Sequence, residues 1–481
     1  MEHHIGQDSC IQWKDTQSYA EDNTRESMIR KGDKAIFKLE KLVYKGYAAG
    51  HILGQFTLTR GAYPGEVVLA TVTKKKRDFL ECRLDKVLIP SKKRVEPRCQ
   101  HFGICGGCSW QDLDYNEQLL WKERIVRESL ARLGGLSLPE ESFLPIIPSP
   151  KIFEYRNKLE LQFAQNQNGE IIVGMHPRGR FNTVFKLREC RLASPKISEI
   201  ADVVSNIASE LRLSTYNERK RQGLLRYLTI REGTNGFMVN ITVFRREREL
   251  LSELARGVVD SIGEVRVVNY ILNDTPSSTA YGMESGYLAG DSDLILEMLG
   301  KRFIVSPQSF FQTNTDGASI LYQKLSEMLD LKGGESLVDL FSGTGTIGII
   351  LSDKAERVVA IENNPDAVKD AKRNAKINGA NNIRFILADV KNALSKLITD
   401  GEKPDVIVVD PPRDGLSKKI ISRIVELAPR KIAYISCNPT TVARDLKELS
   451  EKYRILSIQP VDMFPHTYHI ETITFMEKIM T

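Results

Sequence analysis

Two reactive side chains stand near the end of the sequence, Cys437 and Glu471. Cys437 follows the apolar run KIAYIS and precedes an Asn-Pro pair, which favours the end of a strand there. A cysteine thiolate is a strong nucleophile, and a carboxylate can act as a general base. Glu471 begins the final apolar run, ETITFMEKI. If that strand runs antiparallel to its neighbours, its start lies at the same sheet edge as their carboxyl ends, so the pattern predicts a nucleophile and a base at one site.

A glycine-rich loop of the form G-x-G-x-x-G occupies residues 343–348, just after the apolar run SLVDLF. Such glycines let a ligand approach the backbone at the carboxyl edge of a parallel sheet. Glu362 ends the next apolar run, nineteen positions after Gly343, where a carboxylate can bind ribose hydroxyls. Asp389 ends the third run and is expected near an adenine or, alternatively, as a cap of the following segment. This loop alone fits NAD(P) and S-adenosylmethionine equally well.

The fourth apolar run ends in Asp410-Pro411-Pro412-Arg413. Two prolines after an acid fix a rigid, extended turn at the end of a strand. Methyltransferases that act on amino groups or pyrimidines commonly carry a related element, whereas nicotinamide enzymes do not need it. The alternative is a simple proline turn. The element favours S-adenosylmethionine as the cofactor.

A thiolate, a base and a methyl donor together suit one reaction, methylation of uracil at C5. This carbon is too weak a nucleophile to take a methyl group directly. A thiolate that adds at C6 turns C5 into an enolate-like carbon that can attack a methylsulfonium. A base must then remove the C5 proton so that the thiolate can leave. The ordinary alternatives are an inert buried cysteine for Cys437 and a solvent-facing acid for Glu471.

The segment before the last apolar run contains His466, His469 and Glu471. Two histidines and a glutamate could also bind a metal ion. The reaction described above requires no metal and needs the glutamate as a base, so this reading is the less favoured one. His466 is expected to position Glu471 or to contact RNA.

The chain contains seven cysteines, and Cys99, Cys105 and Cys108 form a cluster that Cys190 follows after a long gap. An odd number in a reducing compartment disfavours a disulfide framework and points to metal binding or catalysis. By spacing alone, four thiolates could hold Zn²⁺ or an iron–sulfur cluster.

The hydrophobic patterning predicts several domains, as expected for 481 residues. Residues 1–27 form a polar tail, and the short alternating runs in 28–88 predict a small OB-like β-barrel. Residues 89–300 form a mixed α+β domain that holds the cysteines and a helix at 115–133. Strands and helices then alternate, so residues 301–481 are expected to form an α/β, Rossmann-like domain with a doubly wound parallel sheet.

The composition fits a globular protein, with 41% hydrophobic and 27% charged residues and a net charge of +6. Ten Lys or Arg stand against four Asp or Glu between Lys74 and Arg98, which suits a polyanionic partner. A solvated surface is the alternative. The sequence has no apolar run of 18 residues and no secretory signal at its start. We therefore expect a cytoplasmic protein with no membrane association and no obligate protein partner.

The final third of the chain resembles the RNA 5-methyluridine methyltransferases. The matching stretches are SPQSFFQTN (306–314), DLFSGTGTIG (339–348), DPPRDG (410–415), SCNPTTVARDL (436–446) and DMFPHTYHIE (462–471). The resemblance implies Cys437 as nucleophile and Glu471 as proton acceptor. It also implies that S-adenosylmethionine is contacted by Gln312, Phe341, Glu362 and Asp410, and less consistently by Thr346 and Asp389. The glycine-rich loop adds Gly343 to the expected cofactor-binding residues. Many members have a cysteine and an asparagine within the stretch corresponding to Ser342–Thr346, which bears on cofactor contacts but not on the chemistry.

The N-terminal half of the chain resembles one branch of this methyltransferase family. Residues 28–88, with GAYPGEVV at 61–68, look like the RNA-binding TRAM module. Cys99, Cys105, Cys108 and Cys190 match the [4Fe–4S] ligands of the branch that methylates ribosomal RNA. The tRNA-modifying branch typically lacks both features, so the resemblance implies 23S rRNA as the substrate. We expect the cluster to have a structural role.

Several alternatives remain open from sequence. One is a tRNA uridine-C5 methyltransferase, and another is an rRNA methyltransferase that acts on guanine or adenine amino groups and has no use for Cys437. A non-catalytic RNA-binding assembly factor and an NAD-dependent enzyme are the others. A uridine that enters such a pocket must leave its base stack. The candidate stacking partners are Phe310, Phe311, Phe464 and Tyr468.

Overall fold

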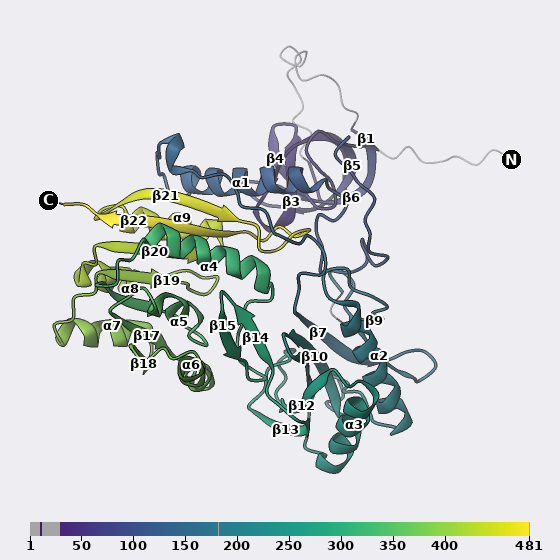
Figure 1. Ribbon diagram of the computed structural model, residues 1–481. Coiled ribbons are helices and arrows are strands. Elements are labelled where there is room, and N and C mark those ends of the chain that lie inside the picture. The colour runs from purple at the N-terminus through teal and green to yellow at the C-terminus, as the bar shows by residue number, and fades with distance from the viewer. Residues whose placement is uncertain (1–9, 12–28, 181, 481) are drawn as a thin grey trace. The chain divides into compact units, whose positions relative to one another are not determined.

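The computed structural model describes residues 10–11, 29–180 and 182–480 (Figure 1). The predicted tail, 1–27, therefore lies outside the described residues except for Cys10–Ile11, which forms the short strand β1. The chain divides into two compact units. The smaller contains Met1–Arg98, Gly107–Ile125 and His466–Tyr468, and the larger contains Cys99–Gly106, Val126–Pro465 and His469–Thr481.

The smaller unit is built on a closed β-barrel. Its strands are β2 (Lys34–Val43), β3 (Tyr47–Ile52), β4 (Gln55–Thr59), β5 (Val67–Lys75) and β6 (Leu80–Ile89). They pair in the order β2-β3-β4-β6-β5, and an antiparallel pairing of β2 with β5 closes the barrel. Alternate residues of β2 such as Phe37 and Leu39 point into the core, as a half-buried strand requires. The predicted N-terminal β-barrel is confirmed, and its last strand ends at Ile89.

Helix α1 (Tyr115–Arg132) ends one residue before the predicted boundary. Its start is capped by Asp114, whose Oδ1 accepts hydrogen bonds from the backbone N–H groups of Asn116 and Glu117 at 3.0 and 3.3 Å. Trp121 and Ile125 of this helix belong to the apolar core of the barrel. The three- and four-residue spacing of apolar residues therefore predicted this helix correctly.

The larger unit contains two seven-stranded sheets, and the first has the order β13-β12-β11-β10-β7-β8-β9. The strands are β7 (Lys158–Gln165), β8 (Ile171–Met175), β9 (Phe185–Lys186), β10 (Leu225–Gly233), β11 (Gly236–Val243), β12 (Val265–Leu272) and β13 (Glu284–Gly290). Helices α2 (Pro195–Glu210) and α3 (Arg248–Ser261) pack with the apolar residues of one face. The alternate residues of the strands are polar yet buried, among them Thr229, Arg231, Asn240, Thr242 and Asn269.

The second sheet of the larger unit has the order β18-β17-β16-β19-β20-β22-β21. Its strands are β16 (Ser336–Leu340), β17 (Arg357–Glu362), β18 (Ile383–Leu387), β19 (Val406–Val409), β20 (Lys431–Ser436), β21 (Tyr453–Val461) and β22 (Glu471–Lys478). The first five are parallel, whereas β22 runs antiparallel to both β20 and β21. The predicted direction of the last strand is thereby confirmed.

Helices cover both faces of this sheet (Figure 1). Helices α4 (Thr315–Leu329), α5 (Thr346–Ser352) and α6 (Pro365–Ile377) contribute to one apolar core, and α7 (Val390–Thr399), α8 (Lys418–Leu427) and α9 (Pro439–Leu449) to the other. Alternate residues of a strand point to opposite cores: Val406 and Val408 to the first, Ile407 and Val409 to the second. The predicted α/β, doubly wound domain is confirmed.

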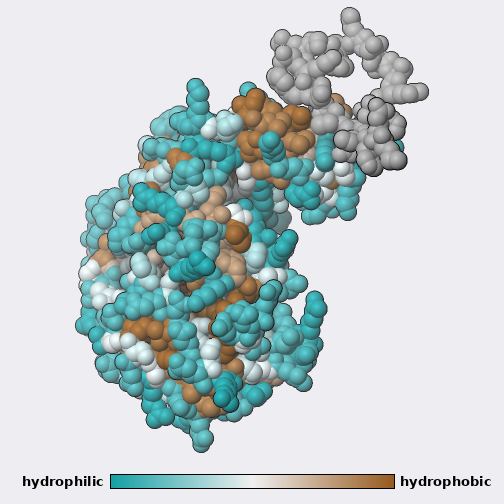
Figure 2. Space-filling model, turned by 90° about the vertical axis from the view of Figure 1, so that its right-hand side faces the viewer, coloured by the Kyte–Doolittle hydropathy of each residue, from teal (hydrophilic) through white to brown (hydrophobic). Residues whose placement is uncertain are grey.

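A two-stranded hairpin, β14 (Ile295–Met298) and β15 (Lys301–Ile304), precedes this domain. Hydrophilic residues dominate the face of the molecule in Figure 2, with separate hydrophobic patches between them. None of the helices in the described ranges is both long enough and apolar enough to span a bilayer.

Candidate active site

Cys437 and Glu471 face each other at the end of two paired strands. The last pair in the register of β20 and β22 is Ser436 with Thr472, so Cys437 and Glu471 are the next residues on each side. Thr472 donates a hydrogen bond through Oγ1 to the Ser436 carbonyl oxygen at 3.3 Å, which fixes this end of the ladder. Opposed residues of antiparallel strands point to the same side of a sheet. The structure thus brings together the two residues that the sequence predicted to share a site.

Burial dominates the electrostatics of this pair. Burial first, and then the Glu471 carboxylate, raise the pKa of the Cys437 thiol to about 12, while Arg413 opposes the shift. Glu471 is 5% exposed. Burial raises the pKa of its carboxyl well above the usual range, the Asp410 charge adds to the shift, and Arg413 again opposes it. Ionising either group therefore costs free energy in the resting protein, and Arg413 is the cation that lowers this cost.

Asp410 belongs to the same cluster of acids. It follows β19 at the carboxyl edge of the sheet, and burial raises its pKa to about 7. Its backbone N–H lies 3.4 Å from the Leu340 carbonyl oxygen at the end of β16. Asp410 thereby stands between the end of the strand that leads to the glycine loop and the Cys437–Glu471 pair.

The turn that follows Asp410 is anchored by α9. Asp445 of α9 is fully buried and accepts hydrogen bonds from the Leu416 N–H and the Tyr434 hydroxyl, both at 2.7 Å. Arg444 donates through Nη2 to the carbonyl oxygens of Asp414 and Leu416 at 2.9 and 3.1 Å. The prolines alone therefore do not fix this turn.

Gln312 lies next to the acids, and two residues that sequence reasoning missed hold it. The buried Tyr322 of α4 forms a hydrogen bond with the Gln312 side chain; burial first, and then the Asp410 charge, raise the pKa of this tyrosine well above its usual value. Asn157 donates through Nδ2 to the Gln312 carbonyl oxygen at 3.0 Å. Tyr322 has the spacing of a core residue on an amphipathic helix, and Asn157 is 155 positions away from Gln312. Neither gave a signal in the sequence.

The glycine loop occupies the turn between β16 and α5. Phe341 and Gly345 have φ values of 61° and 79°, the left-handed region that a sharp strand-to-helix turn uses. The Glu362 carboxylate accepts hydrogen bonds from three backbone N–H groups, of Gly343 at 2.9 Å, Asn363 at 2.9 Å and Asn364 at 2.8 Å. Glu362 therefore fixes the loop from the end of β17.

Asp389 is the N-cap of α7, and its Oδ1 accepts from the Asn392 N–H at 3.3 Å. The capping alternative is thus what the structure shows, while contact with an adenine stays a prediction. Thr346 is buried at the first position of α5, with its hydroxyl 3.2 Å from that of Thr344.

His466 has a partner other than Glu471. It belongs to the smaller unit, where its N–H donates to Gln118 Oε1 at 2.8 Å and its Nδ1 lies 3.2 Å from Gln118 Nε2. His469 and Glu471 belong to the larger unit. Within the ranges that the structure describes, no three His, Cys, Asp or Glu side chains are grouped so as to hold a metal ion. The His-His-Glu metal site therefore has no support.

The predicted cluster cysteines are divided between the units. Cys108 belongs to the smaller one, and Gln111 Nε2 lies 3.5 Å from its Sγ. Cys99, Cys105 and Cys190 belong to the larger one. Burial raises the pKa of Cys190, and the charges of Cys105 and Cys99 raise it further, which shows that these thiols are neighbours. Among the described residues, these cysteines included, no three side chains are grouped closely enough to hold a metal ion. The structure therefore brings the four predicted thiols together only in part.

The candidate stacking residues differ in exposure. Phe310 is 62% exposed, whereas Phe311 is buried in the core against Phe303. Phe464 is partly buried and packs against the same core. Tyr468 lies edge-on to Tyr44 within the smaller unit. Of these four, Phe310 offers the most open ring.

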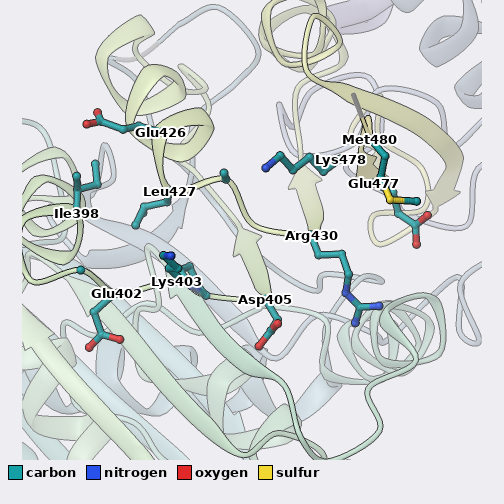
Figure 3. Close-up of a pocket in the computed structure, with 13 residues that line it drawn as sticks. Ile398, Glu402, Lys403, Asp405, Glu426, Leu427, Arg430, Glu477, Lys478 and Met480 are labelled. Carbon is teal, nitrogen blue, oxygen red and sulfur yellow. The ribbon is translucent and has the colours of Figure 1, made fainter.

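A large cavity of about 820 Å³ lies at the opposite edge of the sheet from Cys437 (Figure 3). Its lining includes Asp405 and Arg430, which directly precede β19 and β20, and Lys478 at the end of β22. Ligands of doubly wound sheets bind at the carboxyl ends of the parallel strands. This cavity is therefore separate from the candidate active site.

Comparisons with known proteins agree with this geometry. A family model described as tRNA (Uracil-5-)-methyltransferase matches residues 291–479. An RNA methyltransferase of Bacteroides thetaiotaomicron is 38% identical to the chain, and the alignment covers 86% of the chain and 95% of that protein. An RNA methyltransferase of Caldanaerobacter subterraneus subsp. tengcongensis is 37% identical, and the alignment covers 94% of the chain and 100% of that protein.

Among solved structures, the chain is similar to the tRNA (uracil-54, C5)-methyltransferase of Pyrococcus abyssi, which was crystallised with S-adenosyl-L-homocysteine. The TM-score is 0.73 and the identity 28%, and the match covers 92% of this chain and 99% of that one. The chain therefore belongs to the RNA uracil-5 methyltransferase family and is an S-adenosylmethionine-dependent RNA methyltransferase.

Proposed function

We propose that the enzyme methylates C5 of a uridine in 23S rRNA through a covalent bond between Cys437 and C6. The observation that supports the chemistry is the register of β20 and β22, because Cys437 and Glu471 directly follow and precede the residues of its last pair, Ser436 with Thr472. The Cys437 thiolate adds to C6, and the electron pair moves to C5. C5 then attacks the methyl group of S-adenosylmethionine, and the sulfonium leaves as the thioether.

Glu471 completes the cycle. After methyl transfer, C5 carries both a proton and the new methyl group. The Glu471 carboxylate takes that proton, the C5–C6 double bond forms again, and the Cys437 thiolate is expelled. The buried position of Glu471 supports this role, because a carboxylate whose pKa is raised is a stronger base than an exposed one.

The residues proposed to hold S-adenosylmethionine surround the carboxyl edge of β16, β17 and β19. They are Phe341, Gly343, Glu362 and Asp410 at the ends of these three strands, Asp389 after β18, and Gln312 before α4. The cofactor supplies the electrophilic methyl group. Glu362 is proposed to accept hydrogen bonds from the ribose hydroxyls while it fixes the glycine loop, and the raised pKa of Asp410 suits an acid that faces a polar ligand in an enclosed site.

The assignment to 23S rRNA rests on the barrel and on the cysteine pattern. A specific observation favours tRNA as the second candidate, because a tRNA enzyme covers 92% of the chain. Incubation with 23S rRNA and with tRNA that lack 5-methyluridine, followed by nucleoside analysis, separates the two. Methylation of tRNA alone would remove the 23S assignment and leave the chemistry intact.

The covalent step is tested with RNA that contains 5-fluorouridine. Fluorine cannot be removed as a proton, so the enzyme should stall as an adduct that survives denaturing electrophoresis and maps to Cys437. Cys437→Ala should form no adduct while it still binds S-adenosylhomocysteine. An adduct at another residue, or methyl transfer by Cys437→Ala, would overturn the proposal.

We further propose that Cys99, Cys105, Cys108 and Cys190 hold a structural [4Fe–4S] cluster. The neighbouring thiols of Cys99, Cys105 and Cys190 support it, since thiolates are the ligands that such clusters use. Anaerobically purified protein should contain iron and acid-labile sulfide, and Cys105→Ser should lose both. Cys82→Ser, in the barrel core, is the matched control and should keep them. Zinc in place of iron in the wild-type protein would refute the cluster type.

A further inference from the structure

We propose that the loop between β12 and β13, residues 273–283, is a preorganised RNA-binding loop whose Tyr281 ring stacks on an unpaired base beside the target uridine. This inference rests on the proposed function and adds a substrate-binding residue to it.

The loop has no regular secondary structure, yet buried side chains hold its backbone. Arg226 of β10, 2% exposed, donates through Nη1 to the carbonyl oxygens of Asn273 and Thr275 at 2.5 and 2.9 Å. Its Nη2 donates to the carbonyl oxygen of Ser277 at 2.7 Å. Burying a guanidinium is costly unless its hydrogen bonds are satisfied. Here one buried cation fixes three carbonyls of a single surface loop.

Other buried groups fix the second half of the loop. Asn273 Nδ2 donates to the carbonyl oxygens of Thr279 and Tyr281 at 3.0 and 2.7 Å. Thr242 Oγ1 donates to the Ala280 carbonyl oxygen at 2.8 Å. A Cβ atom at Gly282 would lie 2.1 Å from the Leu272 carbonyl oxygen, so only glycine fits there. The backbone around Tyr281 is thus held on both sides.

This rigid loop displays apolar side chains to solvent. Tyr281 is 40% exposed and Met283 is 63% exposed. The Lys158 ammonium lies 5.2 Å from the centroid of the Tyr281 ring and 3.4 Å from its hydroxyl, which orients the ring. A fixed, exposed aromatic ring is typical of a stacking surface for bases.

The loop also adjoins the segment that carries the candidate active-site residue Gln312. The Gly282 N–H donates to Gln308 Oε1 at 2.7 Å, and Gln308 stands two positions before the exposed Phe310 and four before Gln312. Arg226 makes these loop contacts with neutral carbonyls, while Glu218 accepts a hydrogen bond from Ser278 at 2.9 Å, so the loop carries charges of both signs. The exposed ring, and not a net charge, is the feature that fits an unstacked nucleotide next to the flipped uridine.

The first test measures binding without turnover. Binding of a labelled single-stranded oligouridylate is measured by fluorescence anisotropy. Tyr281→Ala should raise the Kd about 5- to 100-fold, because the free energy of stacking one base on an aromatic ring corresponds to a change of that size. Tyr281→Phe keeps the ring and should bind within about 2-fold of wild type. The matched control is Tyr287→Ala. Tyr287 lies on β13 and is also exposed, at 60%, but an extended chain carries it about 20 Å away from Tyr281. It should bind as wild type does.

The second test reports stacking directly. A 2-aminopurine is placed beside 5-fluorouridine in the same RNA, and its fluorescence is followed as the covalent complex forms. Quenching that is present in the wild type and Tyr281→Phe but lost in Tyr281→Ala supports the inference. In steady-state methylation Tyr281→Ala should raise KM for RNA more than it lowers kcat.

Equal binding by Tyr281→Ala and wild type, or an equal loss in Tyr287→Ala, would overturn the inference. Failure of the wild type to form an adduct would instead count against the proposed function, because the anisotropy experiment does not need the adduct.

Discussion

The Oδ2 atom of Asp445 accepts a hydrogen bond from the backbone N–H of Leu416 at 2.7 Å, and this bond joins α9 to the turn that follows Asp410. The two residues are 29 positions apart. Gly415 lies so close that a Cβ atom there would be 2.5 Å from Asp445 Oδ2. The turn after Asp410 and helix α9, which starts just after Cys437, are therefore held together by this bond.

Gly415→Ala should break this link. Its φ of +73° is already unfavourable for alanine, and the clash with Asp445 comes in addition, so we expect a loss of about 2 to 5 kcal/mol in unfolding free energy and weaker cofactor binding. Gly401→Ala is the matched control, with φ +71° and nothing within 4 Å of the added Cβ. It should cost only about 1 to 2 kcal/mol. Chemical denaturation and calorimetric titration with S-adenosylhomocysteine measure both effects; equal losses in the two variants would contradict the linkage.

Glu471→Gln should stop the reaction after methyl transfer. Without a base the C5 proton stays in place and the Cys437–C6 bond cannot break, so ordinary uridine RNA should accumulate as a methylated adduct, with turnover reduced by about 100-fold or more. Gel shift under denaturing conditions and mass spectrometry detect the product. The double variant Cys437→Ala/Glu471→Gln should give no adduct. Release of methylated RNA by Glu471→Gln at the wild-type rate would show that another group is the base.

Asp339→Asn should change how stability depends on pH. Burial is the main cause that raises the Asp339 pKa to about 8, with the Gly348 N–H opposing it. The pKa of Asp339 is higher in the folded protein than in the unfolded chain. The free energy of unfolding is therefore not reduced by this group below about pH 4, and it falls by about 1.4 kcal/mol per pH unit as the pH rises towards 8. The variant lacks this loss, so its melting temperature relative to wild type should rise between pH 5 and about 8.

Asp405→Asn provides a control of opposite sign. Burial raises the Asp405 pKa, but hydrogen bonds from Ser336 lower it overall. The ionised Asp405 carboxylate therefore adds to the free energy of unfolding at pH values above its pKa in the unfolded chain, and this contribution is lost in acid. Relative to the wild type, Asp405→Asn should be destabilised most at neutral pH. The same pH trend in both variants would show that these carboxyls do not set the dependence.

Glu362→Gln should weaken cofactor binding. The carboxylate accepts three backbone N–H groups and is proposed to bind ribose, and a neutral amide can replace it only in part. We expect the Kd for S-adenosylhomocysteine to rise about 10- to 100-fold by calorimetric titration. Glu356→Gln, an exposed acid just before the same strand, should leave the Kd unchanged. If both variants bind as wild type does, Glu362 has no part in cofactor binding.

Local patterns predicted most of the doubly wound domain. β17 ends at Glu362, where the apolar run ends in the sequence, since a buried parallel strand is a continuous apolar run between turn signals. The adjacency of Cys437 and Glu471 followed from one further assumption, that the last strand runs antiparallel. Tyr322, Asn157 and Arg226 were not predictable, because each acts through contacts with residues distant in sequence or through burial. The link from Asn157 to Gln312, for example, spans 155 positions.

Strand β22 carries a consequence for how the enzyme can change. Its residues from Glu471 to Met476 are all buried, with Ile473 and Phe475 in one apolar core and Met476 in the other. A slip of this strand by one residue against β20 would turn every side chain to the opposite face, so Ile473 and Phe475 would leave their core at the same time as the glutamate left the thiol. The packing that fixes the register of β22 therefore also keeps the proposed base beside the proposed nucleophile.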